Sequence, residues 1–201
     1  MLKLAGECIE GQLAEHKASV IAHSHQLMDR LKPDKNQILL PANYFGTVAV
    51  TANRLVGTLL PVPRDMTLSH LVIEVTSAAE AGKIARLGIY KIGDNFYPGD
   101  LLLDAGTVAV DSTGLKTLQI SGGQKLTKGI YFIATISDGA PTVRYYSSAW
   151  SPIGANTTNL AGVVTSLYKN GENPAALADP FPAPDGEWSS GYGAVRISSL
   201  D

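Results

Sequence analysis

The stretch that decides the fold is residues 86–103, RLGIYKIGDNFYPGDLLL. Apolar and polar residues alternate through residues 83–92, which predicts a strand with one buried face. Residues 93–95 break the alternation, and Pro98-Gly99 is a turn dipeptide. Residues 101–103 are apolar again and predict a second strand that returns to the core. The buried face of the first strand is expected to carry Ala85, Leu87 and Ile89.

The rest of the chain beyond residue 41 repeats this pattern of short strands and turns. With no long helical pattern between them, strands spaced 8–14 residues apart favour a sandwich over a parallel α/β sheet. We therefore predict a mainly β fold, a jelly-roll-like antiparallel β-sandwich over residues 41–201. The proline-rich residues 173–193 are suited to cover a sheet edge or build a loop. The predicted strands are residues 47–51, 58–62, 71–76, 83–92, 101–103, 107–110, 115–120, 129–136, 143–146, 163–167 and 194–197.

Residues 1–35 have a different period. Six residues recur at spacings of four and three, which is typical of a heptad seam about three heptads long. Because an isolated helix of this length is marginal in water, its stripe needs a partner. We predict that residues 1–40 are an N-terminal α-helical attachment or trimerisation segment, with a possible trimeric coiled coil. The residues at the trimer axis would be Ile9, Leu13, His16, Val20, His23 and Leu27.

The two histidines of this seam have two interpretations. They are either tolerated polar interruptions of a helix face, or they line the three-fold axis and set its register. His23 and His25 do not predict a metal site, because side chains two residues apart on a helix diverge by about 200°. We expect no cofactor and no metal.

Composition excludes several classes of protein. The 201 residues carry a net charge of −2 and a pI of about 6.1, which gives no basic footprint for nucleic acid. Cys8 is the one cysteine, so an internal disulfide framework is excluded. No run of about 18 apolar residues predicts membrane insertion. The N-terminus lacks the apolar core of a signal peptide, so we expect synthesis in a cytoplasm and no secretion by that route.

Catalytic motifs are absent from the sequence. It contains no G-x-S-x-G, no P-loop and no H-E-x-x-H. His70 is the one histidine of the β region, and we interpret it as an exposed or edge residue. Four aspartates lie in glycine-containing turns, where aspartate is ordinary turn chemistry. We predict that the chain is not an enzyme. The four are Asp94, Asp100, Asp104 and Asp111.

Binding residues are easier to propose. Sugar sites pair aromatic faces with hydrogen-bonding Asp, Asn and Arg in shallow pockets, and the loops here offer that mixture. The alternative for each aromatic is packing in the core or between subunits. Tyr145-Tyr146 should place one ring outward, because strand neighbours face opposite sides. The predicted ligand-binding residues are Asn95, Phe96, Tyr97, Arg144, Tyr146, Trp150 and Trp188.

Several motifs, in this order, resemble a domain of tailed-bacteriophage virion proteins. They are HLVIEVTSAAEAGKIARLGIY (70–90), YPGDLLLDAGTVAVDSTGLKTLQI (97–120), LTKGIYFIATISDG (126–139), NPAALADPFPAP (173–184) and GAVRI (193–197). The similarity covers about residues 45–200. The segment EHKASVIAHSHQLMDR (15–30) resembles the attachment segment of fibre-type phage proteins.

The resemblance implies a virion protein of the tail-fibre, baseplate or receptor-binding type. It implies a homotrimer that is attached to other virion proteins through its N-terminal segment. The β-sandwich would be displayed outward on the particle and would contact a host surface glycan. The alternative is a head decoration, baseplate or adaptor protein that binds other virion proteins and has no receptor role.

Overall fold

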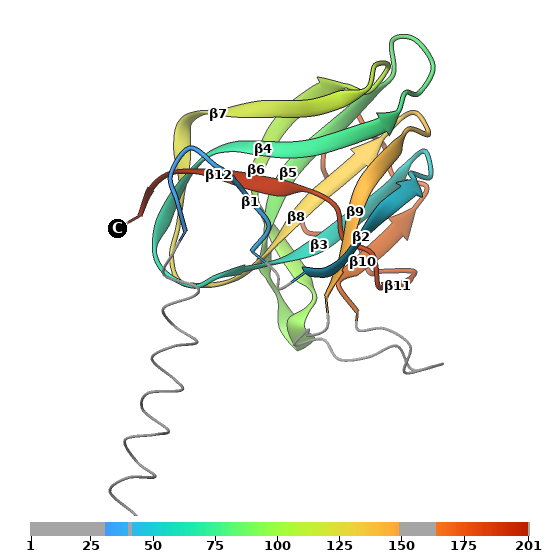
Figure 1. The fold of residues 1–201 in the computed structure, drawn as a ribbon. Coiled ribbons are helices and arrows are strands. Elements are labelled where there is room, and N and C mark those ends of the chain that lie inside the picture. Colours follow the sequence, from blue (N-terminus) through green and yellow to red (C-terminus); the bar gives the residue numbers. More distant parts are fainter. Residues whose placement is uncertain (1–30, 40–41, 149–163, 201) are drawn as a thin grey trace, which may run out of the picture. The chain divides into compact units, whose positions relative to one another are not determined.

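The computed structural model describes residues 31–39, 42–148 and 164–200, which form two facing antiparallel sheets (Figure 1). This confirms the predicted mainly β sandwich. Sheet A consists of β1 (Asn36–Gln37), β2 (Ala42–Ala49), β4 (Met66–Ser77), β7 (Gly114–Leu126), β9 (Thr142–Ser148) and β12 (Ala194–Leu200). Sheet B consists of β3 (Arg54–Val62), β5 (Ile84–Ile92), β6 (Pro98–Ala109), β8 (Gly129–Ser137), β10 (Ser166–Asn170) and β11 (Gly186–Trp188).

Strand β4 is the centre of sheet A. Along one edge, its residues 66–75 pair with β7. The other edge is shared, because β12 pairs with residues 66–72 and β9 joins only at residues 75–77. Strand β1 extends the sheet beyond β12, and β2 extends it beyond β9. Sheet B has the simpler order β11-β10-β3-β8-β5-β6.

The stretch that decides the fold forms β5, the short 3-10 helix η1 (Asp94–Phe96) and β6. As predicted, Ala85, Leu87 and Ile89 are buried in the core between the sheets. The prediction that the other face of β5 is open was wrong at Tyr90, which is fully buried. The proline-rich tail covers it: Phe181 packs edge-on against the Tyr90 ring at 5.1 Å.

Two predicted turns are bulges inside longer strands. Residues 104–106 were expected to separate two strands, but β6 runs through them with a shift of register against β5. Residues 122–123 likewise lie within β7, opposite a register shift in β4. Gly106, Gly122 and Gly123 all have positive φ, which glycine adopts at little cost, so the extra residues are absorbed without ending the strand.

The predicted N-terminal helix and its axis residues Ile9, Leu13, His16, Val20, His23 and Leu27 lie outside the described residues. Within the predicted segment 1–40, residues 36–37 form β1, which pairs with β12. Leu39 is buried with the core of the sandwich. The described ranges contain no α-helix, and hence none that is long and apolar enough to cross a membrane.

Candidate functional site

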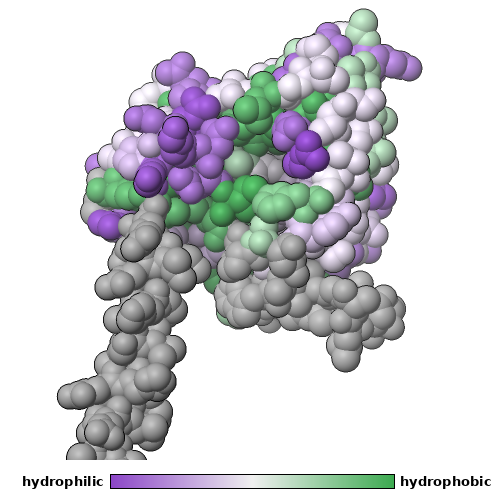
Figure 2. Space-filling view, in the orientation of Figure 1, coloured by the Kyte–Doolittle hydropathy of each residue, from purple (hydrophilic) through white to green (hydrophobic). Residues whose placement is uncertain are grey.

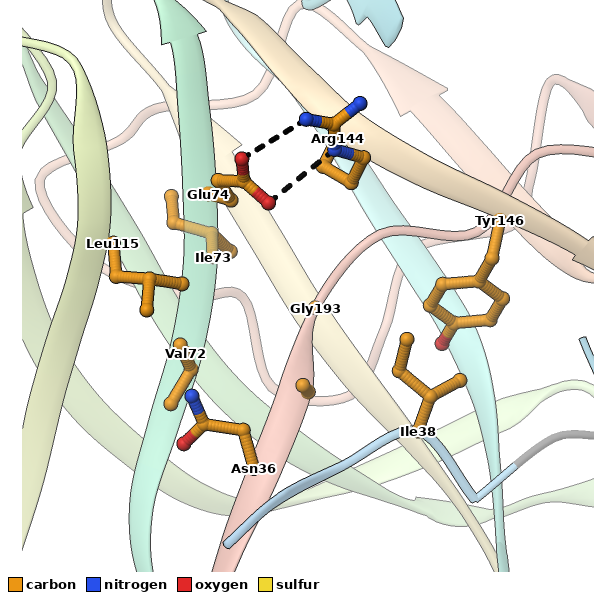
Figure 3. Close-up of a pocket in the computed structure, with 10 residues that line it drawn as sticks. Asn36, Ile38, Val72, Ile73, Glu74, Leu115, Arg144, Tyr146 and Gly193 are labelled. Atoms are coloured by element: carbon orange, nitrogen blue, oxygen red, sulfur yellow. Dashed lines mark hydrogen bonds and ion pairs between the residues drawn. The ribbon is translucent and has the colours of Figure 1, made fainter. Parts of the chain in front are cut away.

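A hollow opens in sheet A where β12 and β9 divide one edge of β4. The last pair between β12 and this part of β4 joins Ala194 to Val72, and the first pair of β9 joins Val143 to Val75. Between these pairs the two partner strands diverge. The space left has a volume of about 160 Å³. Ten residues line it: Asn36, Ile38, Val72, Ile73, Glu74, Leu115, Arg144, Tyr146, Gly193 and Ala194 (Figure 3).

Aliphatic side chains dominate the lining. Ile38 borders the space from the segment after β1, Val72 from β4 and Leu115 from β7 (Figure 3). Leu115 is 61% exposed. Figure 2 shows apolar residues gathered over this face of the sandwich, with hydrophilic residues beside them. The hollow is therefore suited to an apolar group of a ligand or partner.

The polar groups at the hollow are already paired. Arg144 donates from Nη2 to Oε1 of Glu74 at 3.1 Å and from Nε to Oε2 at 3.3 Å (Figure 3). Asn36 accepts a hydrogen bond from Nε of Arg196 at 3.1 Å. The ion pair is exposed and contributes little to stability, but it leaves no net charge on the rim.

Tyr146 closes one side of the hollow (Figure 3). It was predicted to bind ligand, yet its side chain is 4% exposed and belongs to the core cluster with Leu55, Phe132 and Phe181. Burial raises the pKa of its phenol, so the ring stays neutral. Of the two adjacent tyrosines, Tyr145 is the less buried, and its ring lies against Gly46 and Tyr44. Tyr146 thus shapes one side of the hollow but offers little exposed surface to a ligand.

The loop between β5 and β6 carries a second group of predicted residues. Phe96 is 46% exposed and Tyr97 38% exposed, beside the exposed carboxylates of Asp94 and Asp100. Phe96 has a φ of 62°, a left-handed backbone conformation that a bulky residue rarely adopts. Such strain persists where the surroundings over-determine it.

The base of this loop is built closely. A Cβ on Gly99 would lie 2.9 Å from Cα of Gly93, so the two chain segments touch through their glycines. The proline-rich tail holds the start of β6: Phe181 donates its N–H to the carbonyl of Gly99 at 2.9 Å, and Asp179 accepts the N–H of Leu101 at 2.9 Å. The base of the loop that carries Phe96 and Tyr97 is therefore fixed by close backbone contact and by hydrogen bonds to the tail.

The other predicted binding residues are scattered. Trp188 lies in β11, partly buried, and packs edge-on against Tyr192 with ring centroids 6.3 Å apart. Trp150 and the side chain of Asn95 lie outside the described part of the chain. The structure thus brings Arg144 and Tyr146 together at the hollow, and Phe96 and Tyr97 together on the loop, but the two groups do not form one site.

Sequence reasoning missed exposed apolar residues on sheet A. Tyr44 and Phe45 lie outside the predicted strands, of which the first begins at residue 47, but they belong to β2 and have exposed fractions of 57% and 54%. Leu115 was counted as an ordinary strand residue. The signal that could have found Tyr44 and Phe45 is a pair of adjacent aromatics in an uncharged β segment.

Two of the four aspartates that were considered as catalytic candidates accept hydrogen bonds from backbone N–H groups. Asp104 pairs with Arg86 at 2.9 Å and accepts the N–H groups of Gly106 and Leu177. Asp111 accepts the N–H of Gly82 at 3.1 Å. Across residues 31–39, 42–148 and 164–200, no three His, Cys, Asp or Glu residues gather in the manner of a metal site.

No protein-family model and no curated protein matches this chain. Among solved structures, the cysteine protease and lectin-like domains of Cwp84, a surface layer associated protein of Clostridium difficile, align with 76% of this chain at 10% identity and a TM-score of 0.46. A variant of the clostridial cysteine protease Cwp84 after propeptide cleavage aligns with 77% at 10% identity and a TM-score of 0.47. Infectious bursal disease virus Gx strain aligns with 81% at 14% identity and a TM-score of 0.25. The chain spans 34% and 38% of the two Cwp84 structures and 40% of the viral one.

Proposed function

We propose that this chain is a structural protein of a tailed-phage virion, a trimeric tail-fibre or receptor-binding protein that contacts the host cell surface. The order of the sequence motifs across residues 45–200 supports this proposal, because it resembles that of a domain of tailed-bacteriophage virion proteins. Binding would rely on avidity, since three weak sites on one particle hold a surface far more strongly than one. No catalysis is required of the chain.

We further infer that the sandwich is a jelly roll. Eight strands give the orders β2-β9-β4-β7 and β3-β8-β5-β6. From β2 to β9 the chain alternates between the sheets at every step except the β5–β6 hairpin. Double-sheet arrangements of eight strands are used by viral capsid and lectin domains, which suits a displayed binding protein.

The observation that carries the host-contact proposal is the β5–β6 loop. Phe96 and Tyr97 are both well exposed, and carboxylates flank them. Aromatic faces beside hydrogen-bonding acids suit the flat, hydroxyl-rich rings of a surface glycan. The fixed base of the loop would hold Phe96 and Tyr97 in place, which lowers the entropic cost of binding.

Labelling of particles tests the virion assignment. Antibodies raised against the full chain are expected to label the tails of particles purified from the phage that encodes it, when viewed by electron microscopy. Antibodies that bind the isolated chain but leave intact particles unlabelled along the tail would contradict a displayed position there.

The hollow in sheet A favours a second candidate, a head decoration, baseplate or adaptor protein. Its lining is apolar and its one ion pair is already closed, so it offers few free polar groups to a sugar. An apolar side chain of another virion protein would suit it better.

Paired variants separate the two candidates. Tyr97→Ser removes an exposed aromatic from the loop, and Leu115→Gln removes an exposed aliphatic from the rim of the hollow. If the loop contacts the host, Tyr97→Ser lowers adsorption several-fold and Leu115→Gln does not. The opposite pattern, with loss of incorporation into particles for Leu115→Gln, would favour the adaptor role.

A further inference from the structure

We propose that β2 is an interface through which two copies of this chain join, β2 against β2 in antiparallel alignment about a two-fold axis. The joined strands would make the two A sheets continuous. This contact is separate from the hollow, the β5–β6 loop and the N-terminal segment. If the N-terminal segments join the chain in threes, β2 contacts join two such trimers, and the full assembly contains six copies.

Within the described part of the chain, β2 is an edge strand. It is the last strand of sheet A and hydrogen-bonds along one side to β9, from Ala42 to Ala49. None of the described residues forms a backbone pair with its other side. An edge of eight residues presents a row of N–H and C=O groups that can template another strand.

The other edges of the sandwich are protected in the ways that natural sheets use. Strands β1 and β11 are only two and three residues long. The β6 edge carries Asp100 and Asp104 and is bonded by the tail at Leu101. The β7 edge carries Lys116 and Lys125 and is bent by its bulge.

Strand β2, ANYFGTVA, has none of these protections. It contains no charged residue and no proline. A two-fold axis brings a strand against its own copy, so an edge strand whose charges all have one sign gathers like charges when it pairs with itself. Pairing of β6 with β6 would gather aspartates, and pairing of β7 with β7 would gather lysines. Of the described edges, β2 is the long one on which self-pairing meets no such repulsion, so we take a second copy of this chain as the occupant.

Exposed aromatics flank this edge on both faces. Tyr44 and Phe45 are neighbours on the strand, so they point to opposite faces of sheet A. The Tyr44 ring lies 5.9 Å from that of Tyr145, which in turn covers Gly46. A second copy would bury aromatic surface on both faces while its backbone completes the ladder.

Cysteine cross-linking tests the contact in the full chain. In a Cys8→Ser background, one cysteine at a time replaces Tyr44, Phe45, Gly46 and Thr47, and mild oxidation is followed by a non-reducing gel. The control is Thr117→Cys, an exposed position on the same outer face of sheet A but in β7. We expect covalent dimers to peak at one position or two neighbouring positions of β2, several-fold above the control. Dimer yields at all four positions equal to the control would overturn the proposal.

Charge introduction gives an independent measurement. Thr47→Lys places two lysines near the axis, whereas Thr117→Lys adds the same charge away from it. Sedimentation equilibrium of the full chain is expected to give an even number of copies for the wild type and for Thr117→Lys, and half that number for Thr47→Lys. An odd number of copies in the wild type, or an unchanged mass for Thr47→Lys, would contradict a β2–β2 contact.

Discussion

Phe96 is the residue whose backbone conformation is hardest to explain by folding alone. Its φ of 62° would suit glycine, yet the side chain is nearly half exposed and so adds little to the core. We expect Phe96→Gly to raise the free energy of unfolding by on the order of 1 kcal/mol, because glycine removes the strain. Phe96→Ala keeps the strain and is the control. Urea denaturation of both variants measures the difference, and a Phe96→Gly protein less stable than Phe96→Ala would disprove strain at this residue.

His70 predicts a dependence of stability on pH. Partial burial and the charge of Arg196 lower its pKa in the folded protein below the ordinary 6.5, against an opposing effect of Asp34. The unfolded chain therefore binds the proton more readily, and stability contributed by the neutral imidazole is lost as pH falls below about 6.5. We expect the drop in free energy of unfolding between pH 7.5 and 5.5 to be smaller in His70→Gln than in the wild type. Equal drops in urea denaturation would show that His70 does not contribute.

The proline-rich tail is held against the β5–β6 pair by hydrogen bonds and by packing. Arg86 donates to the carbonyl of Pro174 at 2.9 Å, and the Tyr90 hydroxyl donates to the carbonyl of Ala178 at 2.5 Å. Leu177 lies directly over Gly88, where any Cβ would overlap both Leu177 and the carbonyl oxygen of Leu103. The tail thus converts the outer face of β5 into a second buried surface.

Gly88→Ala tests this packing. We expect a loss of about 2 kcal/mol in the free energy of unfolding, since an overpacked site forces neighbouring groups to move. Gly129→Ala is the control, because its nearest contact would be an ordinary 3.7 Å and its φ is not positive. A Gly88→Ala protein as stable as Gly129→Ala in urea would mean that the tail moves away from β5 without cost.

Local sequence patterns predicted the β elements well wherever one face of a strand is buried. The alternation of Ala85, Leu87 and Ile89 found β5, because periodicity reports burial directly. It could not find the burial of Tyr90, which depends on a tail that lies far along the chain. Gly106 and Gly122 were interpreted as turn residues, but they form bulges inside longer strands, since a turn and a bulge both use a glycine with positive φ.

The candidate site was less predictable for the same reason. Arg144 was predicted as a ligand-binding residue, but its partner Glu74 is set by the pairing of β4 with β9. The hollow arises from two strands that share one edge of β4, a property of topology that no local pattern encodes. Tyr146 was predicted as a contact residue because sequence alone does not reveal which of two adjacent rings is buried.

The predicted N-terminal coiled coil sets the number of copies in the assembled protein. If residues 1–35 form a three-stranded coiled coil, the full chain contains a multiple of three copies, and deletion of these residues removes that multiple. Sedimentation equilibrium of both proteins measures it. A deletion variant that is still trimeric would move the three-fold interface to the β-sandwich, and a full chain without three-fold multiplicity would leave the fibre model without its axis.

Attachment of a particle to its host is the function proposed for this chain, and a competition assay for adsorption measures it. Host cells are incubated with increasing amounts of purified full chain before phage particles are added, and free particles are counted with time. The account predicts that the wild-type chain slows adsorption in a dose-dependent manner and that Tyr97→Ser competes less well. Adsorption at an unchanged rate under a large excess of correctly folded chain would contradict a receptor-binding role.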